Sequence, residues 1–159
     1  MEIKKTNLKF KHTPSVRRKT NQIILHCSAT PEGKDFTPEQ VHRWHLERGF
    51  IGCGYNFIIE RDGTILECRP ENCVGAHCTN HNSFSVGICY IGGMDENNKN
   101  PRDTRTVEQK ESMYQLVQYL LEKYHLTLMD VHCHREFANK QCPCFDINDF
   151  RNEYLKWVQ

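Results

Sequence analysis

The sequence predicts an α/β protein, a single domain with a central mixed β-sheet flanked by α-helices. Three observations predict it. Short apolar runs alternate with segments of helical periodicity, two capping boxes mark helix starts, and one hairpin signal interrupts the alternation. A chain of 159 residues suits one domain with a sizeable core. It contains no internal repeat and no linker long enough to divide it.

The first predicted strand and helix lie within residues 22–49. The apolar, partly β-branched run QIILHC at 22–27 is typical of a buried strand. A capping box at Thr37–Gln40 then predicts a helix, because threonine caps, proline suits the first turn and glutamine follows three positions later. Gly49 is a natural residue for the end of that helix.

A hairpin and a central strand come next. Strands at about 55–60 and 64–68 flank Asp62-Gly63, a strong short-range hairpin signal. The polar, turn-rich residues 69–83 predict a long surface loop. The following run SVGICYIGG, residues 85–93, is typical of another buried strand.

The last third of the chain is predicted to contain two helices and one strand. A loop of turn formers at 94–105 precedes a second capping box at Thr106–Gln109, and the helix it opens should run to about Tyr124. MDVHC, residues 129–133, predicts a short strand, and a helix near 146–158 closes the chain.

Charge and composition exclude several classes of partner. Residues 1–20 are rich in lysine and arginine with little apolar periodicity, so we expect a mobile or loosely docked basic extension ahead of a domain at 21–159. The net charge of +1 gives no electrostatic reason for binding nucleic acid or an anionic membrane. No apolar run reaches the roughly 20 residues of a membrane-spanning helix. We expect a monomer that is cytoplasmic on synthesis, because neither a long heptad pattern nor a signal peptide is present.

A cluster of imidazole and thiol groups predicts a zinc site. The chain has nine cysteines, and without a secretory signal we expect reduced thiols, one or two of them metal ligands. His26 together with His134 and Cys142 would leave one tetrahedral position for water, as in catalytic zinc sites. His132, His134, Cys142 and Cys144 would instead form a closed structural site without His26. Ligand chemistry leaves both arrangements open.

Four segments follow one another along the chain: HCSAT at 26–30, GYNFIIERDG at 54–63, GAHCTNHNSFSVGI at 75–88 and HREFANKQCPCFD at 134–146. Together they resemble the zinc-dependent N-acetylmuramoyl-L-alanine amidases, the family of phage amidase-type lysozymes and peptidoglycan recognition proteins. The resemblance covers about residues 22–150. Four blocks in order are more specific than any one alone. Cys133 departs from the family, which usually has glycine before the ligand histidine.

The resemblance implies a role for seven residues. It implies Zn2+ bound by His26, His134 and Cys142, with Tyr55 and Lys140 as catalytic residues and with His77 and Asn82 lining the substrate groove. Each residue also has an ordinary alternative. A tyrosine in a strand can simply pack, a loop lysine is usually solvated, and histidine and asparagine are common in loops. The two helix histidines, His42 and His45, are predicted to serve helix surface and packing rather than metal binding.

The resemblance implies a peptidoglycan hydrolase that cleaves the amide between N-acetylmuramic acid and L-alanine. A chain without a signal that acts on the cell wall after release suggests a phage or prophage endolysin. Two other functions remain open from sequence. One is a non-catalytic peptidoglycan-binding module, and the other is an interaction protein that uses zinc only structurally.

Overall fold

Two six-residue strands, β2 (Gln22–Cys27) and β6 (Ser85–Tyr90), form the centre of the computed structural model, which describes residues 1–159. All of β6 and all but the first residue of β2 are buried, as expected for strands covered on both faces. They pair in parallel within a six-stranded sheet of order β1-β5-β4-β6-β2-β8. The other strands are shorter: β1 (Ile3–Lys5), β4 (Phe57–Ile59), β5 (Ile65–Glu67) and β8 (Val131–Cys133).

The sheet is mixed because of one hairpin. Strands β4 and β5 are antiparallel, and the turn between them contains Gly63 at a φ of 91°, a conformation that glycine adopts readily. All other pairings within the sheet are parallel. The predicted mixed sheet in a single α/β domain is therefore confirmed.

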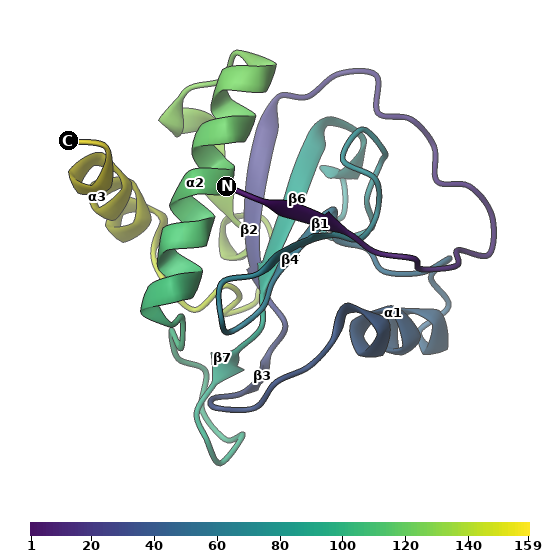
Figure 1. The fold of residues 1–159 in the computed structure, drawn as a ribbon, viewed down its shortest axis with the longest axis horizontal. Helices are drawn as coiled ribbons and strands as arrows, with labels where there is room; N and C mark the ends of the chain where they lie inside the picture. The colour runs from purple at the N-terminus through teal and green to yellow at the C-terminus, as the bar shows by residue number, and fades with distance from the viewer.

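Three α-helices cover the sheet: α1 (Pro38–Glu47), α2 (Val107–Tyr124) and α3 (Ile147–Val158). Both predicted capping boxes are present, with the hydroxyls of Thr37 and Thr106 accepting from the third residue of each helix. Helices α2 and α3 lie on one face of the sheet and α1 on the other (Figure 1). No helix combines the length and the apolar character that crossing a membrane would require.

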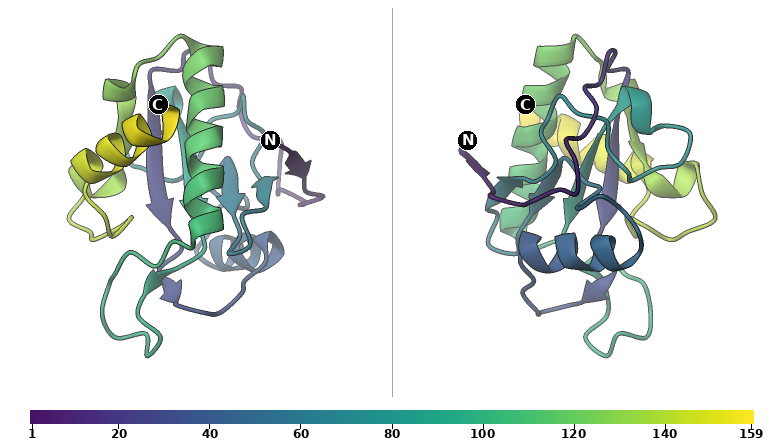
Figure 2. Two further views of the ribbon diagram at one scale, coloured as in Figure 1. Left: turned by 60° about the vertical axis from the view of Figure 1, so that its left-hand side comes forward. Right: turned by 90° about the vertical axis from the view of Figure 1, so that its right-hand side faces the viewer.

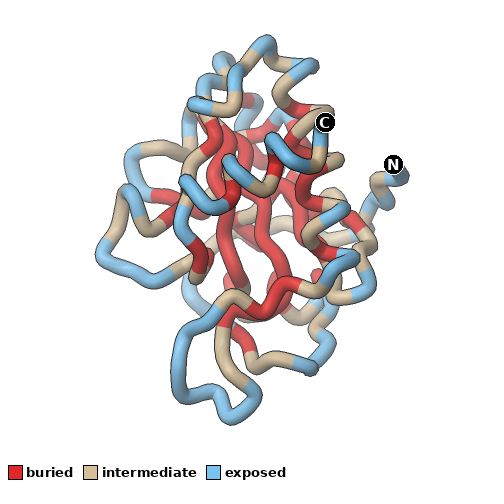
Figure 3. The backbone as a smooth tube through the Cα atoms, turned by 90° about the vertical axis from the view of Figure 1, so that its left-hand side faces the viewer, coloured by how far each residue is buried: buried red, intermediate tan, exposed pale blue.

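Side-chain alternation along β2 decides what faces each layer. Ile23, Leu25 and Cys27 belong to a core of 19 buried residues that also contains the apolar faces of α2 and α3. Residues 24 and 26 therefore point to the face that α1 covers. The buried strands run between exposed loops in Figure 3. His26, at 1% exposure, is thus kept out of the main core and directed to the opposite face.

Residues 1–20, which the sequence predicts to be a mobile or loosely docked basic extension, contact the rest of the chain in the structure. Strand β1 pairs with β5, and the segment after it passes along the α1 side of the sheet (Figure 2). Arg17 is buried and donates to the carbonyl of Cys73 at 2.9 Å. These contacts join residues that are far apart in the chain, so the local sequence pattern does not indicate them. The division of the chain at residue 20 stays a prediction.

Several short elements were not predicted from sequence. Strands β3 (Thr30–Pro31) and β7 (Gly93–Met94) pair with each other outside the main sheet. Single 3-10 turns occur at Asn82–Phe84, Leu128–Asp130 and His134–Glu136. Elements of two or three residues carry no periodicity, so a sequence pattern cannot reveal them.

Candidate active site

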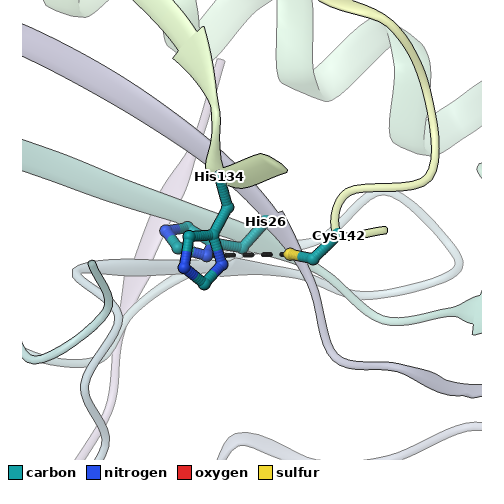
Figure 4. A group of neighbouring side chains, drawn as sticks. All are labelled: His26, His134 and Cys142. Atoms are coloured by element: carbon teal, nitrogen blue, oxygen red, sulfur yellow. Dashed lines mark hydrogen bonds between the residues drawn. The ribbon is translucent and has the colours of Figure 1, made fainter. Parts of the chain in front are cut away.

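His26, His134 and Cys142 converge at the end of β2, on the sheet face opposite α2 and α3. Parallel pairing of β2 with β8 sets Leu25 beside Cys133. The residues that follow them in the chain, His26 and His134, therefore lie at the same end of the sheet. The loop after β8 returns toward β2, and the backbone N–H of Cys27 donates to the Cys142 sulfur at 3.2 Å. One nitrogen or sulfur from each of the three side chains lies within 4.8 Å of the others (Figure 4).

The geometry and chemistry of these three side chains fit a zinc ion. Zinc–sulfur and zinc–nitrogen bonds at tetrahedral angles place the two donor atoms about 3.6 Å apart. The Sγ of Cys142 and the Nδ1 of His26 are 3.8 Å apart. Burial, followed by the neighbouring His77, lowers the pKa of His26 well below its usual value, and burial lowers that of His134. Both rings are therefore neutral, the form in which imidazole binds metal.

The closed four-residue arrangement is not formed. Nδ1 of His132 lies 3.2 Å from a carboxylate oxygen of Glu136. The thiol of Cys144 lies against Cys27 at 3.9 Å and donates to the carbonyl of Gly93 at 3.3 Å. The physical reason is that β8 ends at Cys133 and a 3-10 turn begins at His134, so the strand alternation that would put His132 and His134 on one face is broken. The arrangement that uses His26 is the one the tertiary structure produces.

A cavity of about 310 Å³ opens beside the three side chains. His134 borders it, together with all four of the remaining residues that the family resemblance singled out: Tyr55, His77, Asn82 and Lys140. Residues that are scattered along the chain from 55 to 140 therefore share one cavity wall. Because His134 borders the cavity, a small molecule bound there would contact one of the three candidate metal ligands.

Tyr55 is held between two imidazoles just before β4. Its ring centroid is 5.2 Å from that of His26 and 5.3 Å from that of His45. Burial raises the pKa of Tyr55, so its hydroxyl remains a hydrogen-bond donor at neutral pH. Its neighbour Gly54 has no room for a side chain, because a Cβ there would lie 2.1 Å from the carbonyl oxygen of Ala76. The Gly-Tyr pair thus brings the ring close to the loop that follows β5.

Lys140 and Arg48 make the cavity wall electropositive. Both side chains border the cavity, and no aspartate or glutamate does. Neither cation takes part in an ion pair. The guanidinium of Arg48 stacks over the ring of Phe50 at 4.9 Å. Two unpaired cations favour an anionic ligand in this cavity.

His77 and Asn82 are tightly bonded to the protein. Asn82 accepts the backbone N–H groups of His77 and Cys78 at 2.8 and 2.9 Å, which closes the loop. The ring of His77 contacts Nε2 of His26 at 2.8 Å and the hydroxyl of Ser85 at 3.3 Å. Burial lowers the pKa of His77 to about 3, so its ring is neutral. Neither residue behaves as an ordinary loop side chain.

Sequence reasoning missed several residues that build the site. His45, predicted to serve helix packing, does accept the backbone N–H of Gly54 at 2.8 Å but also borders the cavity. The buried Arg69 donates to the carbonyl of Cys53 at 2.9 Å and so supports the segment before Tyr55. Arg48 and Phe50 had no signal beyond their position at a helix end. Their role depends on what the fold places opposite them.

Comparisons with known proteins identify the family that this chain resembles over most of its length. The family model described as N-acetylmuramoyl-L-alanine amidase matches residues 16–145. The endolysin of Klebsiella phage KP32 is 39% identical over 131 residues, covering 82% of this chain and 85% of the relative, and that of Escherichia phage T7 is 38% identical with the same coverage.

Solved structures show the same similarity. The N-acetylmuramoyl-L-alanine amidase LysC from Clostridium intestinale URNW superposes with a TM-score of 0.81 at 30% identity, over 96% of this chain and 97% of that one. Drosophila PGRP-LB, at 23% identity and a TM-score of 0.76 over 98% of this chain and 94% of that one, shares the fold. With a family model that matches residues 16–145 and phage relatives that align over most of their length, the chain belongs to the N-acetylmuramoyl-L-alanine amidase family.

Proposed function

We propose that this protein is a phage endolysin that hydrolyses the amide between the lactyl group of N-acetylmuramic acid and L-alanine in peptidoglycan. The observation that carries the proposal is the convergence of His26, His134 and Cys142 beside a cavity that Tyr55 and Lys140 border. Family membership and the phage relatives support the same activity.

Three residues would hold zinc, and two would act on the substrate. His26, His134 and Cys142 offer two neutral imidazoles and one thiolate, a donor set that zinc prefers. When bound, zinc would polarise the amide carbonyl and activate water near neutral pH. Lys140 would donate a hydrogen bond to the oxyanion that develops during attack. The Tyr55 hydroxyl, which stays protonated, would donate a second one.

The charge of the cavity suits the substrate. A muramyl stem peptide carries free carboxylates, and the wall offers Arg48 and Lys140 without any competing carboxylate. We assign Arg48 to a stem-peptide carboxylate because its guanidinium stands at the cavity on the Phe50 ring. The protein would act as a monomer, made in the cytoplasm and reaching the wall after release.

A purely binding function is less well supported, because a binding module has no need for a thiolate among its ligands. The structure keeps Cys142 at the centre of the cluster, with its sulfur 3.8 Å from His26 Nδ1. Zinc-dependent amide hydrolysis does need such a site, since the ion has to be held with a position free for water. Hydrolysis is therefore the function that uses all the residues gathered here.

The decisive experiment replaces Cys142 with serine and uses Cys144→Ser as the matched control, since Cys144 lies outside the cluster. Metal analysis of each purified protein is combined with mass spectrometry of products from digested sacculi. We expect Cys142→Ser to lose stoichiometric zinc and the release of stem peptides with free L-alanine amino ends, whereas Cys144→Ser keeps both. Undiminished lysis by Cys142→Ser would overturn the proposal.

A further inference from the structure

The ring of His77 occupies a slot built for it behind His26. The residue is 7% exposed, and both ring nitrogens have a partner. Two glycines make the slot. A Cβ at Gly75 or at Gly87 would lie 2.6 Å from a carbon of the His77 ring, closer than real Cβ atoms approach. A histidine that only contacted substrate would not need two glycines to make space for its ring. The His77 ring is therefore placed to bond with other groups of the protein.

The hydrogen bonds around this ring have a direction, set at Ser85. Its hydroxyl lies 2.7 Å from the backbone carbonyl of His81, which can only accept, so the serine proton is used there. The serine oxygen, 3.3 Å from Nε2 of His77, then accepts that N–H. The neutral His77 ring carries its lone pair on Nδ1, and this atom accepts from Nε2 of His26 at 2.8 Å.

The consequence appears on the other side of the His26 ring. With its proton on Nε2, His26 carries its lone pair on Nδ1, the atom that faces the Cys142 sulfur at 3.8 Å. His134 has no hydrogen bond to either ring nitrogen, so nothing equivalent selects its tautomer. The arrangement is therefore specific to one of the candidate ligands and is not a general feature of the cluster.

We propose that His77 is a positioning residue, directed by Ser85, that holds His26 in the tautomer with a free Nδ1 lone pair for the metal. This rests on the proposed zinc site and revises the role that the family resemblance implies for His77. The His77 side chain borders the cavity, but its shortest hydrogen bond is to Nε2 of the candidate metal ligand His26. Partners in this position typically change metal affinity by about 10–100-fold when removed.

The test replaces His77 with leucine, which fills the slot without an acceptor, and with glutamine, which restores one. Zinc dissociation constants are measured by competition with a chromophoric chelator. We expect a loss of about 10–100-fold for His77→Leu and partial recovery for His77→Gln. Ser85→Ala tests the direction of the hydrogen bonds and should weaken zinc binding by a smaller factor. Ser83→Ala, at an exposed position in the 3-10 turn just before β6, should not change it.

A spectroscopic measurement tests the tautomer of His26 separately from the proposed zinc-dependent hydrolysis. Nitrogen-15 NMR of the metal-free wild type should show His26 protonated on Nε2 alone, and Ser85→Ala should give a mixture of tautomers. The proposal is overturned by a mixture in the wild type, or by a zinc dissociation constant within twofold of wild type in a folded His77→Leu. Absence of stoichiometric zinc binding by the wild type would instead overturn the proposed function, and the tautomer measurement would still decide the hydrogen-bond chain.

Discussion

Asn56, the residue after Tyr55, should be among the most costly single positions to change outside the main core. Its side chain is 0% exposed and makes three hydrogen bonds. The amide nitrogen donates to the carbonyls of Pro70 and Cys73 at 3.0 and 3.1 Å, and the oxygen accepts the backbone N–H of Gly87 at 2.9 Å. One side chain thus ties the loop after β5 to the central strand that backs the site.

The expected loss in the free energy of unfolding for Asn56→Ala follows from which hydrogen bonds each partner of the side chain keeps. The two carbonyls retain other donors, the N–H of Cys73 on Pro70 and the guanidinium of Arg17 on Cys73, so each lost bond costs about 1 kcal/mol. The buried N–H of Gly87 loses its acceptor, which costs about 1–3 kcal/mol. The free energy of unfolding should therefore fall by about 3–5 kcal/mol, which a typical domain survives.

Guanidinium denaturation followed by far-ultraviolet circular dichroism measures this loss, provided that the slope against denaturant is unchanged. The control is Asn97→Ala in an exposed loop, which should stay within about 0.5 kcal/mol of wild type. A loss below about 1 kcal/mol for Asn56→Ala would refute the reasoning. It would mean that the loop is held by something other than these three hydrogen bonds.

Two further variants test the cavity, and a third tests the ion pair between Glu71 and Lys123 of α2. Lys140→Ala should lower kcat by about 100-fold with zinc content unchanged, measured on a muramyl peptide; a change under threefold would remove it from the mechanism. Arg48→Gln should lower kcat/KM by about fivefold for a stem peptide with free carboxylates, whereas Arg43→Gln, exposed on the preceding helix α1, should not. An equal effect of both variants would mean that only the net charge of the protein matters. Glu71→Gln should reduce stability by about 1–3 kcal/mol at pH 7. Burial alone would raise the pKa of Glu71, but hydrogen bonds from Lys123 and two tyrosines hold it below its usual value. The stability that the Glu71 carboxylate contributes is fully present above its unfolded pKa of about 4.5 and is lost on acidification. Denaturation curves should therefore show wild type as more stable than Glu71→Gln at pH 7, and the two proteins as equally stable at pH 3.

Elements with a local signal could be predicted from the sequence. The two capping boxes, at Thr37 and Thr106, begin helices where expected because threonine and the glutamine after it satisfy backbone groups of their own first turn. The hairpin at Asp62-Gly63 forms because the turn conformation is available within the dipeptide itself. In each case the residues that determine the element are also the residues that form it.

Elements defined by partners could not be predicted in this way. Strands β1, β3 and β7 are two or three residues long, and each exists only because another strand lies beside it. The basic N-terminal segment has no periodic pattern, yet Arg17 is buried because its guanidinium finds the carbonyl of Cys73 across 56 residues of chain. Such contacts depend on where the fold brings the two ends of the interaction.

For the site, the sequence by itself determined the chemistry: histidine and cysteine in ordered blocks that resemble one amidase family. It could not choose between a ligand set with His26 and a closed set with His132 and Cys144. Tertiary structure decided this through parallel pairing of Leu25 with Cys133, and through the end of β8 at that residue. Residue types state which ligands are available, but only the register of distant strands decides which of them meet.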